Sequence, residues 1–321
     1  MHRHSILVRV ILVCAVLFSV SIHAGVGQAP AERTAWNRPF APFRVAANVY
    51  YVGAAGVSAF LITTASGAIL IDGGLPETAP QIAANIATLG FRLTNVKYLL
   101  NSHAHFDHAG GLAELKRRSK AQMVASARDG ETLAAGARDM PPVAVDRIVK
   151  DGDTVRVGDT TLTARLTPGH TKGCTTWTMT ASDNGRPVDV IFYCSTSVVD
   201  RLVGNTGYPD IVADYERSFA ALRTIKADIF LGPHPIFFRM DEKIKKMSAG
   251  GPNPFIDPAE LGRFVNESER QFRAALEKER APRLESARQR DAAGSQEGSR
   301  RADAAILDNS TGGAVRGRAE R

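Results

Sequence analysis

Three histidines and an aspartate lie within six residues of one another in NSHAHFDHAGG, residues 101–111. The chain has only eight histidines, so this is an unusual concentration of metal-binding side chains. On an extended segment His103 and His105, two residues apart, project to the same side and can bind one metal ion. Asp107 follows two residues later, and its neighbour His108 points elsewhere. The stretch therefore predicts a loop that contributes ligands to two adjacent metal ions.

Two further histidines follow predicted strands, His170 in TPGHTKG and His234 in GPHP. Alone, each would be an ordinary surface histidine in a turn. Loops that gather at one edge of layered sheets can instead bring both of them to the cluster.

The candidate ligands then form two sets. The first set consists of three histidines, His103, His105 and His170. Catalytic zinc is normally bound by three protein ligands, with the fourth tetrahedral position left for water. The second set combines a carboxylate with two imidazoles: Asp107, His108 and His234. Two metals about 3.5–4 Å apart can share a hydroxide, and a metal lowers the pKa of its water to about 7, so no separate general base is needed.

Short strands and amphipathic helices position these loops. Strands are predicted at 49–53, 58–64 and 68–74, then a helix over 75–90, a strand at 96–101 leading into the cluster, a helix at 111–119 and a strand at 121–126. A second β-rich half has strands at 153–159, 161–170, 174–181 and 188–195, a helix at 214–225 and a strand at 227–235. Asp257, Pro258 and Glu260 predict a capping box that opens a last helix over 257–281. This alternation is typical of a layered α/β fold.

The two ends differ from this pattern. Residues 1–24 combine basic residues, an apolar run and a small residue, which predicts a signal peptide cleaved after Ala24 rather than after Ala29, where Pro30 follows. The apolar run of roughly 15 residues is shorter than the ~20 of a spanning helix, and Arg9 interrupts it, so we expect no stable membrane association after cleavage. Residues 25–281 are predicted to form one domain. Residues 282–321 are charged and rich in Gly and Ser, and are predicted to be a disordered tail.

Composition limits the partners. With 44% hydrophobic and 23% charged residues, the chain can bury a substantial core. The net charge of +7 comes from scattered basic residues without interleaved aromatic side chains, so it predicts a surface that favours small anionic substrates and no nucleic-acid partner. We expect a periplasmic protein that acts as a monomer.

Several motifs together resemble the metallo-β-lactamase superfamily, and specifically the zinc β-lactamases of subclass B3. They are HAHFDHAGG, LIDGG, PGHTKGCTTW, GNTGYPDIVADYERSF, GPHPIFF and GGPNPFIDP, and the likeness spans residues 36–264. The resemblance implies a four-layer αββα sandwich of two mixed sheets and two zinc ions per chain. It also implies opening of the β-lactam ring of penicillins, cephalosporins and carbapenems by a zinc-bound hydroxide, and thus antibiotic resistance.

The resemblance further implies roles for individual residues. The catalytic residues would be His103, His105, His170 and Asp107, with Asp107 binding the second zinc and orienting the nucleophile. Asp72 in LIDGG would either hydrogen-bond to the ligand loops or simply end a strand in a turn.

Substrate contacts are implied at three positions. Ser195 and Ser197 have the spacing to bind the substrate carboxylate, and Thr196 would replace either if the register differs by one. Trp36 would be either a flap over the active site or an anchor in the core.

Cys194 departs from the subclass B3 pattern, because another subclass places a zinc-ligating cysteine near this position. Those enzymes generally lack a histidine at the position of His108, so we expect Asp107, His108 and His234 to bind the second zinc and Cys194 to be a buried strand residue. An oxidising compartment permits a disulfide with Cys174, but sequence does not determine this pairing.

The same fold also serves hydrolases of thioesters, lactones and phosphodiesters. These place a metal-bridging aspartate where this chain has YCSTS, and the nearest carboxylate here is Asp200. That difference, with the export signal, favours β-lactam hydrolysis. A non-catalytic periplasmic zinc-binding protein is the remaining alternative, and the open fourth position speaks against it.

Overall fold

The computed structural model describes residues 30–281. The predicted signal peptide and the predicted tail over 282–321 lie outside the described residues. None of the helices within 30–281 is long and apolar enough to cross a membrane.

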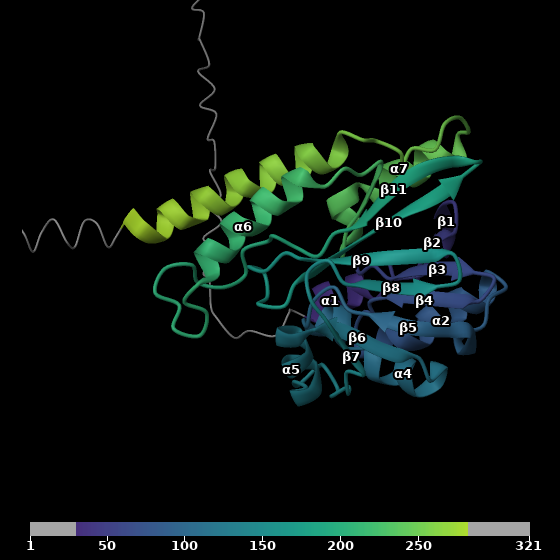
Figure 1. The fold of residues 1–321 in the computed structure, drawn as a ribbon, viewed down its shortest axis with the longest axis horizontal. Helices are drawn as coiled ribbons and strands as arrows, with labels where there is room; N and C mark the ends of the chain where they lie inside the picture. Colours follow the sequence, from purple (N-terminus) through teal and green to yellow (C-terminus); the bar gives the residue numbers. More distant parts are fainter. Residues whose placement is uncertain (1–29, 282–321) are drawn as a thin grey trace, which may run out of the picture.

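Two β-sheets form the centre of the molecule (Figure 1). The first has seven strands in chain order: β1 (Phe43–Ala46), β2 (Val49–Tyr51), β3 (Phe60–Thr64), β4 (Gly67–Ile71), β5 (Val96–Leu100), β6 (Gln122–Ser126) and β7 (Arg147–Val149). The second has five, in the order β12 (Ile229–Leu231), β11 (Arg186–Phe192), β10 (Thr175–Asp183), β9 (Thr160–Leu166) and β8 (Thr154–Val157). Both sheets are mixed, because β4 to β7 pair in parallel after an antiparallel β1 to β4, and β12 alone pairs in parallel in the second sheet.

Helices cover the outer face of each sheet (Figure 1). On the side of the first sheet lie α2 (Ala79–Thr88), α4 (Leu112–Ser119) and α5 (Ala127–Ala135), and on the side of the second lie α6 (Ile211–Thr224) and a long helix over residues 260–281. Further helices complete the described chain: α1 (Pro30–Trp36), η1 (Pro76–Thr78), η2 (Leu93–Asn95), α3 (Phe106–Ala109), η3 (Pro235–Phe238) and α7 (Met240–Ser248). The predicted αββα sandwich is confirmed.

Strand β4 illustrates why the sheets stack in this way. Ile69 and Ile71 are buried in the cluster that contains Trp177 of the second sheet, whereas Leu70 is buried in the cluster with Ile82 of α2. Alternate side chains of a strand point to opposite faces, so a continuously apolar strand needs a partner on both sides. The first sheet is therefore enclosed between helices and the second sheet.

The last helix begins differently from the prediction. It starts at residue 260, and Asp257 Oδ1 accepts a hydrogen bond from the Ala259 amide at 3.1 Å. The carboxylate of Glu260 does not turn back to the Asp257 amide, which donates to the carbonyl of Asp228. Glu260 is buried and bonds to Lys243 of α7 and to Arg239 instead. The predicted capping box is wrong because a buried lysine competes for the glutamate.

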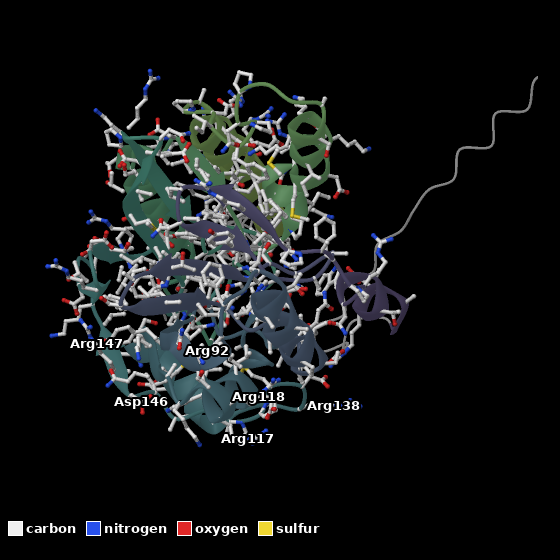
Figure 2. All side chains as sticks on the ribbon, turned by 90° about the vertical axis from the view of Figure 1, so that its right-hand side faces the viewer. Arg92, Arg117, Arg118, Arg138, Asp146 and Arg147 are labelled. Carbon is white, nitrogen blue, oxygen red and sulfur yellow. A yellow bond between two sulfur atoms is a disulfide. The ribbon has the colours of Figure 1, made fainter. Side chains whose placement is uncertain are left out.

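Part of the positive charge collects at one end of the molecule, around α4. Figure 2 shows Arg92, Arg117, Arg118, Arg138 and Arg147 there. Arg117 forms an ion pair with Glu114 at 2.8 Å, and Lys116 forms one with Asp146 at 2.7 Å. Acidic neighbours thus balance some of the charge on this face.

Candidate metal centre

The ligand-rich loop joins β5 to α3. His103 lies outside any helix or strand and His105 has extended backbone, whereas Asp107 and His108 lie in the short helix α3, which begins at Phe106. The two pairs belong to different groups of potential ligands. The start of α3, which was not predicted, separates them rather than a continuous extended loop. His170 lies between β9 and β10, and His234 follows β12.

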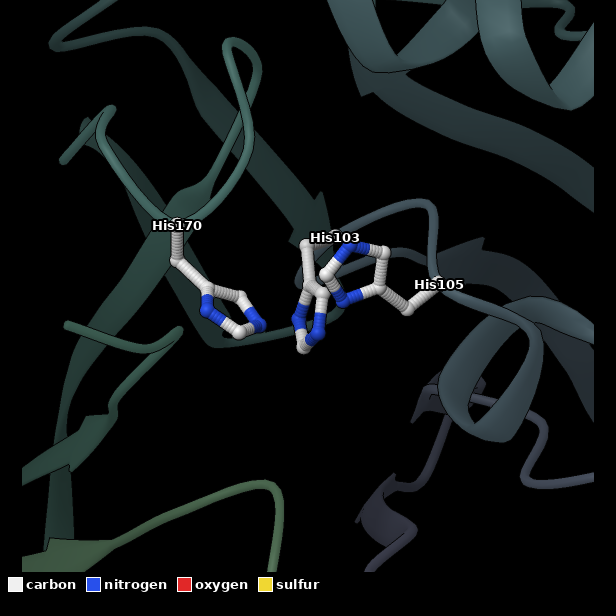
Figure 3. Close-up of side chains that lie close together, drawn as sticks. All are labelled: His103, His105 and His170. Atoms are coloured by element: carbon white, nitrogen blue, oxygen red, sulfur yellow. The ribbon is translucent and has the colours of Figure 1, made fainter. Parts of the chain in front are cut away.

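The three predicted histidines of the first set come together (Figure 3). The ring centroids of His103, His105 and His170 are 4.6–4.8 Å apart, and one nitrogen from each lies within 4.8 Å of the others. Burial lowers the pKa of all three imidazoles, to about 3 for His170. Neutral imidazoles in this arrangement can hold a metal ion.

Neighbouring groups fix how these rings point. Nδ1 of His103 is 3.0 Å from the hydroxyl of Ser102, and Nδ1 of His170 is 2.7 Å from the carbonyl oxygen of Ser197. Nε2 of His103 is buried and has no hydrogen-bond partner among the described residues. This arrangement fits a metal ligand. A histidine that binds a metal through one ring nitrogen usually has its other ring nitrogen hydrogen-bonded to a neighbouring group.

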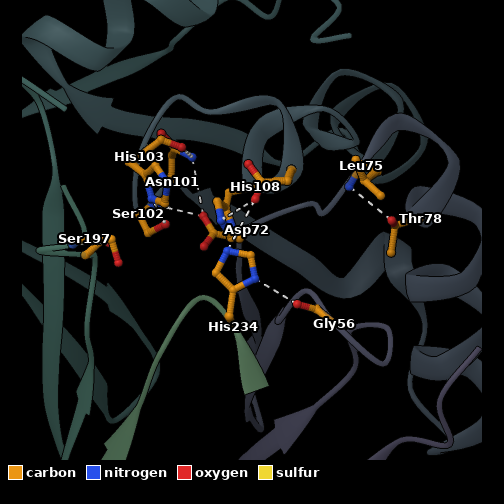
Figure 4. A network of polar contacts seen from close by, with 12 residues as sticks. Gly56, Asp72, Leu75, Thr78, Asn101, Ser102, His103, His108, Ser197 and His234 are labelled. Carbon is orange, nitrogen blue, oxygen red and sulfur yellow. Dashed lines mark hydrogen bonds and ion pairs between the residues drawn. The ribbon is translucent and has the colours of Figure 1, made fainter. Parts of the chain in front are cut away.

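The second predicted set surrounds one carboxylate oxygen. Oδ2 of Asp107 is 3.1 Å from Nε2 of His108 and 3.4 Å from Nε2 of His234. Figure 4 shows the rings of His108 and His234 next to each other. Burial alone would raise the pKa of Asp107, but the two histidines outweigh it and hold that pKa well below its usual range. Nδ1 of His234 is 2.8 Å from the carbonyl oxygen of Gly56, which fixes its ring.

The two sets adjoin each other, because the ring centroids of His103 and His108 are 4.3 Å apart. Each set offers three ligand atoms within 4.8 Å of one another, so the six residues could hold two metal ions side by side. The donor types, imidazole nitrogen and carboxylate oxygen, are those zinc prefers.

Asp72 supports the loop that leads into the first set. Its Oδ1 accepts hydrogen bonds from the Ser102 amide at 2.7 Å and from the Asn101 side chain at 3.4 Å. Burial raises its pKa to about 6, opposed by the nearby His108. Asp72 also ends β4 in a left-handed conformation, with φ of 63°. Both interpretations of this residue are therefore correct.

A cavity of about 610 Å³ opens above both ligand sets. Ser195 and Ser197 line it, whereas Thr196 does not, and its hydroxyl contacts that of Tyr193. Ser195 and Thr196 are both buried. Trp36 is half-buried in the cavity wall, with its ring 5.0 Å from that of His234. Its interpretation as a core anchor is wrong, because α1 lies at the edge of the site.

Cys194 is bonded to Cys174 in a disulfide, and both are fully buried. Cys194 lies two residues past the end of β11 rather than within the strand. A disulfide sulfur is not a thiolate ligand. The arrangement thus favours His108 over Cys194 in the second set.

The family model of the metallo-β-lactamase superfamily matches residues 52–234, more than half of the chain. The chain belongs to this superfamily. The predicted resemblance is thereby confirmed, and the matched segment ends at the last of the six candidate ligands.

Solved structures narrow the resemblance within the superfamily. BJP-1, a subclass B3 metallo-β-lactamase of Bradyrhizobium japonicum, is 43% identical, and the match covers 77% of this chain and 98% of that one with a TM-score of 0.74. FEZ-1, a metallo-β-lactamase of Legionella gormanii, is 38% identical over 75% of this chain and 97% of that one, also with a TM-score of 0.74.

Curated relatives include other hydrolases. A hydroxyacylglutathione hydrolase of Rhodopseudomonas palustris is 40% identical over 96 residues, which is 30% of this chain and 32% of that enzyme. The shared part is thus a fraction of each protein.

One buried residue at this metallo-β-lactamase-type site was not singled out from the sequence. Asp129 of α5 is 3% exposed and accepts hydrogen bonds from both loops that carry the first ligand set, at Ala104 and at Gly173. No sequence signal identified it, because α5 itself was not predicted.

Proposed function

We propose that this protein is an exported di-zinc β-lactamase of the periplasm that opens the ring of penicillins, cephalosporins and carbapenems, and thereby confers antibiotic resistance. The observation that carries the proposal is the pair of adjoining ligand sets at the base of one cavity. The 43% identity to a subclass B3 enzyme over 98% of its length supports the substrate class. We further propose that the protein acts as a monomer.

In this proposal His103, His105 and His170 hold one zinc ion, and Asp107, His108 and His234 hold the other. The unpaired, buried Nε2 of His103 supports the fit. When bound, zinc supplies a Lewis acid that lowers the pKa of water to about 7 and polarises a carbonyl group.

The chain's own residues bind and orient the substrate. Ser195 and Ser197 line the cavity, and their hydroxyls would bind the carboxylate of the β-lactam. The carboxylate of Asp107 would accept a hydrogen bond from the attacking water and so orient it, and its lowered pKa keeps it ionised for that task. Trp36 would cover the bound substrate and exclude water, since its ring already lies against His234.

Thioester hydrolysis is the second candidate, because hydroxyacylglutathione hydrolases are among the relatives. That match covers only about a third of each protein. The segment 193–197 brings no carboxylate to the cavity, and Asp200 is not among the described residues that line it. A non-catalytic zinc-binding protein is the third candidate, and a 610 Å³ cavity above the ligands speaks against it.

The test is a hydrolysis panel of one penicillin, one cephalosporin, one carbapenem and a hydroxyacylglutathione thioester, with zinc content measured on the same sample. We expect two zincs per chain and hydrolysis of the β-lactams that a chelator abolishes. Two bound zincs without β-lactam turnover would refute the proposal, and turnover of the thioester alone would establish the second candidate.

A further inference from the structure

Asp129 lies in the first turn of α5, directly after β6. It is 3% exposed, and no lysine, arginine or histidine of the described chain forms an ion pair with it. A buried carboxylate without a cation is unfavourable unless hydrogen bonds satisfy it. The donors that satisfy this one come from the ligand loops.

Three donors from two loops converge on the Asp129 carboxylate. Oδ2 accepts from the Ala104 amide at 3.0 Å, and Ala104 lies between His103 and His105. Oδ2 also accepts from the Thr171 hydroxyl at 3.0 Å, and Oδ1 accepts from the Gly173 amide at 3.1 Å. Thr171 directly follows His170. One side chain thus spans the loops that carry all three histidines of the first set.

Gly173 is packed tightly against the start of α5. A Cβ added at Gly173 would lie 2.4 Å from the Asp129 amide and 2.4 Å from Oγ of Ser126. Ser126, which caps α5 by accepting from the Asp129 amide, donates to the Gly173 carbonyl at 2.6 Å. The His170 loop is therefore pressed against the start of α5, and its distance from the His103 loop depends on this contact.

We propose that Asp129 is a positioning residue that sets the spacing between the loop with His103 and His105 and the loop with His170, and so sets the zinc affinity of the three-histidine site. The inference rests on the proposed zinc function of that site. Asp129 touches neither the candidate ligands' rings nor the cavity, so it acts only through the two loops.

The test is a zinc titration of the metal-free full chain against a chromophoric chelator, for the wild type and for Asp129→Ala. We expect one of the two zinc dissociation constants to rise about 10- to 100-fold, the range typical of groups that hold metal ligands in place, and the other to stay unchanged. The matched control is Asp228→Ala. Asp228 also accepts a backbone hydrogen bond, from the Asp189 amide at 2.9 Å, but lies before β12 rather than at the ligand edge.

Urea unfolding of the metal-free proteins separates positioning from plain structural support. If Asp129→Ala destabilises the fold but leaves both zinc constants unchanged, or weakens both equally, the inference is overturned. Thr171→Val removes one of the three donors and is the milder variant should Asp129→Ala fail to fold; a rise of about 2- to 10-fold in the same constant is expected, and no change would overturn the inference. A wild type that binds no zinc would instead overturn the proposed function.

Discussion

The disulfide between Cys174 and Cys194 should stabilise the protein without taking part in metal binding. It joins the residue before β10 to the segment after β11, with a sequence separation of 20 residues. Closing a loop of that length removes entropy from the unfolded chain, and the expected contribution is about 3 kcal/mol to the free energy of unfolding. For a domain of this size that corresponds to a fall of about 6–12 °C in the melting temperature when the bond is removed.

The assay compares metal-free wild type with Cys174→Ala/Cys194→Ala by thermal and urea unfolding. Wild type reduced after zinc removal is the control, because it lacks the bond but keeps both sulfurs. Zinc content, measured separately on the reloaded proteins, should remain two per chain. Loss of one zinc equivalent from the double variant would show that Cys194 serves the second site and that the assignment of His108 is wrong.

Other substitutions test single contacts. His170→Ala should remove roughly one zinc per chain and abolish activity, since one ligand of three is lost; metal analysis after dialysis checks this, and unchanged content would refute the ligand assignment. Ser197→Ala should raise KM for β-lactams about 10-fold through loss of a hydrogen bond to a charged group. Thr196→Val should not, because Thr196 does not line the cavity and its hydroxyl contacts that of Tyr193; equal KM values for the two variants would contradict this. Glu260→Gln should lower the free energy of unfolding by about 3–5 kcal/mol, because it leaves the buried Lys243 without its carboxylate. Lys243→Met should lower it less in the same urea experiment, because Glu260 keeps its ion pair with Arg239, and the reverse order would refute the argument.

The parts of the fold with a strong hydrophobic period were predictable. The helix expected over 75–90 is present as η1 and α2, with Ile82 and Ile86 buried and Gly90 in the left-handed conformation that ends it. By contrast, α1, α5 and α7 were not predicted. Each of them is short and has few apolar residues, so no local hydrophobic period marks them.

At the site, the cluster of His103, His105, Asp107 and His108 could be recognised from spacing, because it is a local property. His170 and His234 were added only through the expectation that loops at one edge of layered sheets meet, and the helix α3 that carries Asp107 and His108 was not predicted. The hydrogen bonds that hold those ligands were not predictable. Asp129 and Ala104 are 25 residues apart and Asp129 and Gly173 are 44 apart, and only the tertiary fold brings them together. The same holds for the Cys174–Cys194 pairing, which spacing left open.

The candidate ligands come from both sheets. Four follow β5 of the first sheet, while His170 and His234 follow β9 and β12 of the second. Neither half of the chain carries a complete set, so tight metal binding becomes possible only after the halves have docked. Zinc would then act late in folding: it should slow unfolding of the finished molecule while leaving the rate of folding nearly unchanged, because its ligands are not yet assembled in the transition state.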